Sequence, residues 1–200
     1  MRPSVNGSVV HDLASIYLPN YQFYERHEIT PVAATADAIL DAVENYDDRD
    51  DPVLDALLKV REFPSRALAK LGLKSALTAR PRFGLNDFLL LERSSNQIAF
   101  GLVGRFWRLD FGLIRLESPS DFKSFSNSGA AKLVMTFSVL PNTMSSQLLR
   151  TETRIWCPNL MSKAFFMPYW IVIRIASGWI RRRVLAQIQQ NAEKNCDPSG

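Results

Sequence analysis

Apolar and polar positions alternate with a period of two in two segments of the second half of the chain. In residues 130–140, AAKLVMTFSVL, the odd positions from Ala131 to Val139 are all apolar, and polar side chains stand among the even positions. In residues 147–157, QLLRTETRIWC, the odd positions carry no charge, and the even ones include Arg150, Glu152 and Arg154. Because successive side chains of a strand point to opposite faces, both segments are predicted to be strands, and the first to be half-buried.

Other segments have the helical period. Thr35 is a suitable N-cap for a helix that places Ala38, Ile39, Ala42 and Val43 on one face. A second helix is predicted from about Asp51 to Gly72, with Pro52 at its first position and an interruption at Pro64. Asn159 can cap a long helix from Leu160 to Glu193.

Aromatic and β-branched residues in 21–29 predict a first strand, and residues 88–108 read as a hairpin about Ser94–Asn96. Residues 111–125 are expected to add further strand. The predicted order is therefore strand, two helices, about six strands and one long helix. The expected domain covers residues 21–193, between a loosely held arm at 1–20 and a disordered tail at 194–200.

The long helix carries one apolar stripe along its whole length, at Phe166, Trp170, Ile173, Ser177, Ile180, Val184 and Ile188. Its opposite face is apolar as well, at Ile171, Ile175 and Trp179, so this half of the helix needs a second covering. The apolar run is short for a membrane span and has Arg174 near its middle, which disfavours one. Peripheral contact with a membrane and docking of a second subunit stay open.

Composition changes this picture little. The chain has 200 residues, 46% of them hydrophobic and 22% charged, as in an ordinary soluble protein of one domain. Residues 1–60 carry 4 basic and 11 acidic side chains, and residues 61–200 carry 20 and 9, so the net charges are −7 and +11. The two parts could pair within one fold, or the basic part could meet an anionic partner. No secretory signal is recognisable at the N-terminus, so cytoplasmic residence is expected.

Chemical motifs are few. The sequence lacks GxSxG, HExxH, GxxxxGK[ST] and GxGxxG, and its two cysteines, Cys157 and Cys196, have no metal-ligand spacing. We therefore expect no metal, no cofactor and no nucleic-acid partner, and we interpret Cys157 as a small buried hydrophobe. His27, beside Glu25 and Glu28, favours a structural role over a catalytic one. The segment GLVG, Gly101–Gly104, favours close backbone packing over a phosphate loop.

The element order, with GLVGRFWR, LLRTETRI and FFMPYWIVIRIASGWIRRRVLAQIQQNAE, resembles the helix-grip (SRPBCC) superfamily of START lipid-transfer, birch-pollen-allergen-like and polyketide cyclase-like proteins. The similarity covers roughly residues 21–193 and is most specific to a bacterial branch, whose phenylalanine, Tyr-Trp pair and basic turn match Phe166, Tyr169, Trp170 and Arg181–Arg183. It implies an α+β helix-grip fold: a bent antiparallel sheet of about six to seven strands around the C-terminal helix, with two short helices after the first strand. It also implies a cavity for a hydrophobic ligand.

The leading hypothesis is binding of a small hydrophobic molecule, of lipid, polyketide or isoprenoid type, between the sheet and the long helix. The candidate lining residues are Leu133, Met135, Phe137, Thr151, Thr153, Phe166, Trp170, Ile173 and Ser177. A solid core made of the same residues is the competing interpretation. A cofactor-independent cyclase, aromatase or hydrolase is the second hypothesis, with Glu152 and Arg154 as candidates, although alternation places both on the other face. The third is an interaction module that meets a membrane or forms a homodimer.

Overall fold

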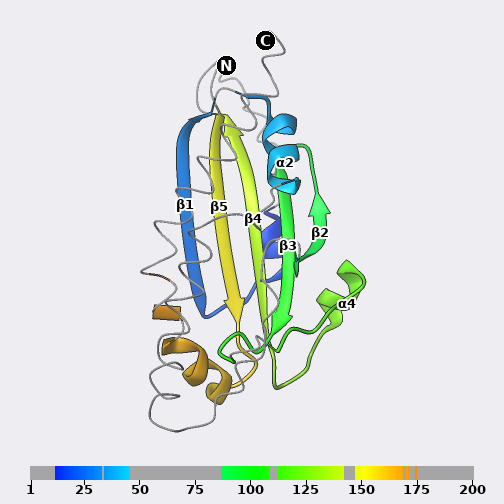
Figure 1. The fold of residues 1–200 in the computed structure, drawn as a ribbon, viewed down its shortest axis with the longest axis vertical. Helices are drawn as coiled ribbons and strands as arrows, with labels where there is room; N and C mark the ends of the chain where they lie inside the picture. The colour runs from blue at the N-terminus through cyan, green and yellow to red at the C-terminus, as the bar shows by residue number, and fades with distance from the viewer. Residues whose placement is uncertain are drawn as a thin grey trace, which may run out of the picture.

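The chain folds around one antiparallel sheet with helices on both of its faces. The structure, a computed structural model, describes residues 12–32, 34–45, 87–108, 112–141, 147–168, 170, 171 and 174. The five strands run in the order β1-β5-β4-β3-β2 (Figure 1). Their bounds are β1 Phe23–Val32, β2 Leu89–Arg93, β3 Gln97–Gly104, β4 Ala131–Pro141 and β5 Gln147–Trp156. The named helices are α1 Leu13–Tyr17, α2 Ala36–Glu44 and α4 Pro119–Ser124, and residues 160–168, 170, 171 and 174 are helical as well.

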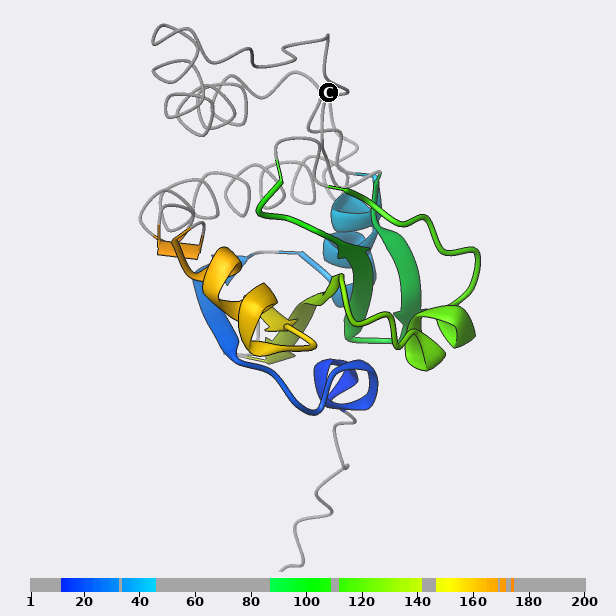
Figure 2. The ribbon, with the colours of Figure 1, turned by 90° about the horizontal axis from the view of Figure 1, so that it is seen from below.

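The sheet is bent into a trough. Figure 2 shows α2 and the helical residues that follow β5 on the concave side, α1 on the convex side and α4 beside the β2 edge. We call the helical residues 160–168, 170 and 171 the C-terminal helix. Because β1 pairs with β5 along nearly its whole length, from Phe23↔Ile155 to Val32↔Gln147, the first and last described strands lie side by side.

Two apolar clusters occupy opposite ends of the concave face. At one end α2 packs on the sheet through Ile39, Leu40 and Val43, against a group formed by Ile98, Phe100, Phe137, Val139 and Leu149. At the other end the C-terminal helix packs on it through Phe166 and Trp170, against Phe23, Leu102, Ala131 and Ile155. Each helix is therefore anchored by its own part of the strands.

The convex face is covered too, which the alternating pattern did not predict. Leu13, Ala14 and Tyr17 of α1 are buried against Ala99, Val103 and Val134, with Phe122 of α4 in the same cluster. Lys132 and Thr136 of β4 are 7% and 2% exposed. The prediction of a half-buried β4 is therefore wrong, because a strand pattern cannot indicate which helix covers its polar face. Within the expected arm, Leu13, Ala14, Tyr17 and Leu18 are buried, so this part is packed on the sheet and not loosely held.

The two predicted helix N-caps, Thr35 and Asn159, are confirmed. Thr35 Oγ1 accepts from the Ala38 amide at the start of α2, and Asn159 Oδ1 accepts from the Ser162 amide at the start of the C-terminal helix. The hairpin of β2 and β3 is also confirmed, with Ser94 and Asn96 in its turn. The helix predicted at 51–72 lies outside the described residues, as does most of the stretch from 172 to 193.

One predicted strand is wrong. In residues 111–125 only Ile114 makes an isolated bridge, to Val103, and Pro119–Ser124 form α4. The helix begins there because Ser118 Oγ accepts from the Asp121 amide and Pro119 suits the first helical turn. The structure thus describes five strands in place of the six to seven expected. Among the described residues, no helix is long and apolar enough to cross a membrane.

Candidate ligand site on the concave face of the sheet

A row of polar side chains crosses the concave face between the two apolar clusters. Glu25 and His27 of β1 face the same side of the sheet as Thr151 and Thr153 of β5, because Glu25 pairs with Thr153 and His27 pairs with Thr151. Directly opposed residues of antiparallel strands hold their Cβ atoms about 4.5–5.5 Å apart. The four polar side chains thus form one compact group, which we call the polar row.

Met135 and Phe137 of β4 continue the polar row with apolar side chains. Their register partners on β5 are Thr153 and Thr151. Met135 lies half-buried against the α2 cluster, and Phe137 is a buried member of it, with its ring edge-on to that of Phe100. One side of the polar row is therefore an apolar wall.

The first half of the polar row is a carboxylate and an imidazole in direct contact. Glu25 Oε1 lies 2.8 Å from His27 Nε2. The side chains of Glu25 and His27 are only 7% and 19% exposed. The two residues alternate with exposed Tyr24 and Arg26 along β1, so the pleat of the strand is what turns them inward.

The second half of the polar row consists of two buried hydroxyls. Thr151 and Thr153 are each 2% exposed, and within the described part of the chain their Oγ1 atoms have no hydrogen-bond partner. A buried hydroxyl left unsatisfied costs about 1–3 kcal/mol, so native proteins rarely keep one without a partner. Two of them side by side are what a bound molecule with an accepting oxygen would satisfy.

An aromatic cluster closes the end of the trough beside the polar row. Phe166 of the C-terminal helix lies edge-on to Phe23 at 4.8 Å between ring centroids, and Trp170 lies 5.7 Å from Phe23. Phe106 also contacts Phe166, at 6.3 Å. Leu133 packs against the same group. This end of the trough is apolar and is made of large, rigid side chains.

The structure therefore places seven of the nine candidate lining residues on the concave face or on the helix that packs against it: Leu133, Met135, Phe137, Thr151, Thr153, Phe166 and Trp170. Ile173 and Ser177 lie outside the described residues.

Sequence reasoning missed Glu25 and His27 as site residues. They stand two apart on the same face as Phe23, so the period of β1 contained the signal. The pairing of Glu25 and His27 with Thr153 and Thr151 follows only from the register of the strands.

Glu152 and Arg154, the candidates for catalysis, lie on the convex face. Arg154 Nε donates to Glu152 Oε1 at 2.6 Å, and its Nη2 donates to Asp12 Oδ2 at 2.8 Å. Arg154 also donates to the Ser15 hydroxyl, so it ties α1 to β5. The expected ion-paired outer face is confirmed, although Arg154 is only 8% exposed. This geometry gives the two residues no access to the trough.

Among the described residues, neither a reactive cysteine nor a group of metal ligands belongs to the candidate site. Burial raises the pKa of the Cys157 thiol to about 11, which Lys163 only partly opposes, so this cysteine stays protonated at neutral pH. It is 4% exposed, as expected of a small buried hydrophobe. Among the described residues no cluster of His, Cys, Asp and Glu could hold a metal ion.

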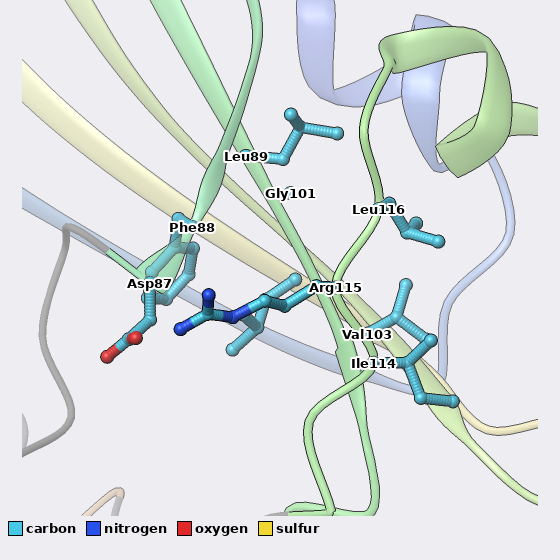
Figure 3. A pocket seen from close by; sticks show the side chains of 9 residues that line it. Asp87, Phe88, Leu89, Gly101, Val103, Ile114, Arg115 and Leu116 are labelled. Atoms are coloured by element: carbon cyan, nitrogen blue, oxygen red, sulfur yellow. The ribbon is translucent and has the colours of Figure 1, made fainter. Parts of the chain in front are cut away.

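A cavity of about 270 Å³ opens beside β3, between the beginning of β2 at Leu89 and the segment around Ile114, which bridges to Val103. Figure 3 shows Arg115 extending across the opening toward Asp87, above a floor that includes Gly101 and Val103. None of the candidate lining residues borders this cavity. Leu102, which does border it, also packs in the cluster of Phe166 and Trp170.

No family model and no curated protein matches the chain. Among solved structures, the crystal structure of TTHA0849 from Thermus thermophilus aligns with 88% of this chain and 100% of its own, at 6% sequence identity and a TM-score of 0.34. A likeness at this level carries no argument about fold details or function. The described part of the chain is of the α+β class, with a five-stranded antiparallel sheet.

Proposed function

We propose that the protein binds a small, largely apolar molecule with an accepting oxygen in the trough between α2 and the C-terminal helix. The observation that carries this proposal is the pair of buried Thr151 and Thr153 hydroxyls, which have no partner among the described residues. They lie between two apolar clusters, and small-molecule sites typically combine apolar walls with a few well-placed polar groups. The ligand is of lipid, polyketide or isoprenoid type, and its carbonyl or hydroxyl oxygen accepts from the threonines.

A helix-grip architecture is part of the same proposal. Two features support it: β1 pairs with the last described strand, and the helix that follows β5 packs on the concave face. In such an arrangement the sheet and the C-terminal helix are the two walls of the ligand site.

The proposal is tested with prodan, a neutral naphthalene ketone dye whose emission reports both apolar surroundings and hydrogen bonding to its carbonyl. We expect it to bind the purified protein, and the variant Thr151→Val/Thr153→Val to bind it about 2- to 12-fold less tightly for each hydrogen bond lost. Thr136→Val, on the convex face of β4, is the matched control and should leave the affinity unchanged.

The same variants separate a ligand site from a solid core. Without ligand, replacing the two hydroxyls by methyl groups should leave the free energy of unfolding unchanged or raise it, because each Thr Oγ1 is buried without a partner among the described residues. If the double variant binds prodan as well as the natural protein does, or if neither binds it, the residues only fill a core and the proposal is wrong.

A second candidate function is contact with an anionic membrane surface through the outward face of the C-terminal helix. The observation that favours it is a set of apolar side chains on this helix that are 45% to 82% exposed: Leu160, Met161, Phe165, Met167 and Ile171. Exposed patches of this kind commonly mark sites of association. Ile171 was expected to need a cover, and it has none among the described residues; Ile175 and Trp179 lie outside them.

The positive charge near this face favours an anionic lipid surface as its partner. Arg174 is exposed one turn after Ile171, and residues 61–200 carry a net charge of +11. Basic and aromatic residues beside an apolar helix face are typical of interfacial helices. Phe165→Ser should weaken co-sedimentation with phosphatidylcholine vesicles that contain phosphatidylglycerol, whereas Ile16→Ser on α1 should not. A homodimer that buries Phe165, or indifference to these vesicles, would contradict this candidate.

A further inference from the structure

The polar row contains two ionisable side chains that binding of a neutral ligand does not require. A ligand oxygen could be held by Thr151 and Thr153 alone, yet the row also holds a carboxylate and an imidazole 2.8 Å apart. Charged groups are seldom placed in an apolar interior, because their desolvation costs several kcal/mol per ion. Apolar residues could occupy the positions of Glu25 and His27, as Phe23 occupies the position at the end of the same face.

We propose that Glu25 and His27 form a proton-transfer pair that acts on the molecule bound beside Thr151 and Thr153, with His27 as the general base. This inference rests on the proposed function, because the substrate occupies the same trough. The substrate class is a carbonyl compound with an acidic C–H bond next to the carbonyl. Glu25 is the positioning residue, and His27 is the catalytic residue.

Geometry assigns the roles. Glu25 Oε1 meets Nε2 of His27, so Nε2 carries the hydrogen of a neutral imidazole and Nδ1 has the free lone pair. A carboxylate that holds an imidazole in one tautomer in this way is a recurrent arrangement in catalysis. His27 pairs across the strands with Thr151, and Glu25 pairs with Thr153, so base and hydroxyl donors lie on one face of the sheet.

The proposed step balances without any further reactant. The C–H bond next to the carbonyl breaks, its proton moves to Nδ1 of His27, and its electron pair forms the C=C bond of an enolate. The negative oxygen of the enolate accepts hydrogen bonds from the Thr151 and Thr153 hydroxyls, which is the stabilisation expected of preorganised donors. The proton then returns from Nδ1 to the same or to a conjugated carbon, which gives exchange or isomerisation.

The test uses nitrobenzisoxazole, a carbon acid that reports a base in an apolar site. A base removes its ring C–H proton, the electron pair forms a C≡N bond, and the N–O bond breaks to give a coloured nitrophenolate. We expect the full-length protein to accelerate this reaction with saturation kinetics. His27→Gln should lower kcat about 100-fold or more and leave KM nearly unchanged, because the substitution removes only the base.

His11, the other histidine of the chain, gives the matched control: His11→Gln should not alter kcat. The role of Glu25 has its own readout, the nitrogen NMR signals of the His27 ring. The natural protein should show one tautomer with hydrogen on Nε2, and Glu25→Gln should show a mixture of tautomers together with a lower kcat. This measurement does not depend on a folded His27 variant, since the natural protein alone reports the tautomer.

Outcomes for the two proposals are distinguishable. If nitrobenzisoxazole displaces prodan but His27→Gln turns it over as fast as the natural protein, the site binds and the proton-transfer pair is wrong. A natural protein whose His27 carries its hydrogen on Nδ1 would also overturn the pair. If nitrobenzisoxazole and prodan both fail to bind, the ligand site itself is wrong and this inference fails with it.

Discussion

Tyr17 is a buried phenol whose hydrogen bonds connect α1 to β2. Its hydroxyl lies 3.0 Å from the Leu91 carbonyl oxygen and 3.0 Å from a Glu92 carboxylate oxygen. Burial, followed by the hydrogen bond to Glu92 and the charge of that carboxylate, raises the pKa of Tyr17 from 10.0 to about 12. The neutral phenol is therefore favoured by folding.

Because the folded pKa is raised, this contribution to stability is complete below pH 10.0 and is lost as the pH rises toward about 12. Tyr17→Phe should cost about 1 kcal/mol at neutral pH, from the lost hydrogen bond, and should flatten the loss of stability above pH 10.0. Urea unfolding at neutral and alkaline pH measures both effects. An alkaline loss that is equally steep in the variant would contradict this assignment.

Gly101 illustrates a different constraint, close packing against a strand. A Cβ atom added there would lie 2.8 Å from two ring atoms of Phe122 and 2.9 Å from a methyl group of Leu91. Gly101→Ala should therefore cost about 1–3 kcal/mol through overpacking. Gly129→Ala is the control, since its new Cβ would approach the far end of the long Arg105 side chain at 3.0 Å. Equal unfolding midpoints for the two variants would be inconsistent with this packing.

For single residues, the sequence predicted some structural roles and missed others. The short GLVG segment predicted close backbone packing, and Gly101 against Phe122 confirms it. Cys157 was correctly expected to be buried. His27 could not be paired with Thr151, because these residues are far apart in the chain and only the β1–β5 register brings them together. The sequence predicted the surroundings of single side chains, but it did not predict their partners on neighbouring strands.

At the scale of elements, Arg154 makes α1 part of the sheet. Its guanidinium donates to Asp12 at the N-cap of α1, to Ser15 within the helix and to the Leu18 carbonyl at its end. A five-residue helix is too short to be stable alone, so these contacts and its buried side chains hold it in place.

Arg154→Met should lower the free energy of unfolding by about 1–3 kcal/mol, since it leaves Glu152 without its closest cation and removes the ties to α1. Hydrogen exchange in residues 12–18 should accelerate. Arg150→Met is the matched control on the same face of β5: its pair with Glu28 is more exposed and should matter by less than about 1 kcal/mol. Unchanged exchange in α1 would show that Arg154 does not anchor it.

The elements that could be predicted are those specified locally. Thr35 and Asn159 cap their helices as expected, and the alternation of β4 and β5 placed the right residues on the concave face. Helix α1 was missed because its helical state depends on tertiary contacts. Helix α4 was missed because apolar residues of 111–125 outweighed the capping signal of Ser118 and Pro119.

For the whole molecule, the important property is the division of the concave face. One apolar cluster belongs to α2 and the other to the C-terminal helix, and the polar row lies where these two meet. Figure 2 shows the bend of the strands, and residues that alternate along them share the concave face. We infer that Thr151 and Thr153 contact a ligand on this concave face.

The most direct measurement of this claim is the set of intermolecular nuclear Overhauser effects between threonine methyl groups and a small molecule that remains bound when the protein is purified from its own host. We predict a retained apolar molecule with contacts to the methyl groups of Thr151 and Thr153, and none to Thr136 on the convex face. No retained molecule, or one whose contacts avoid Thr151 and Thr153, would contradict the account.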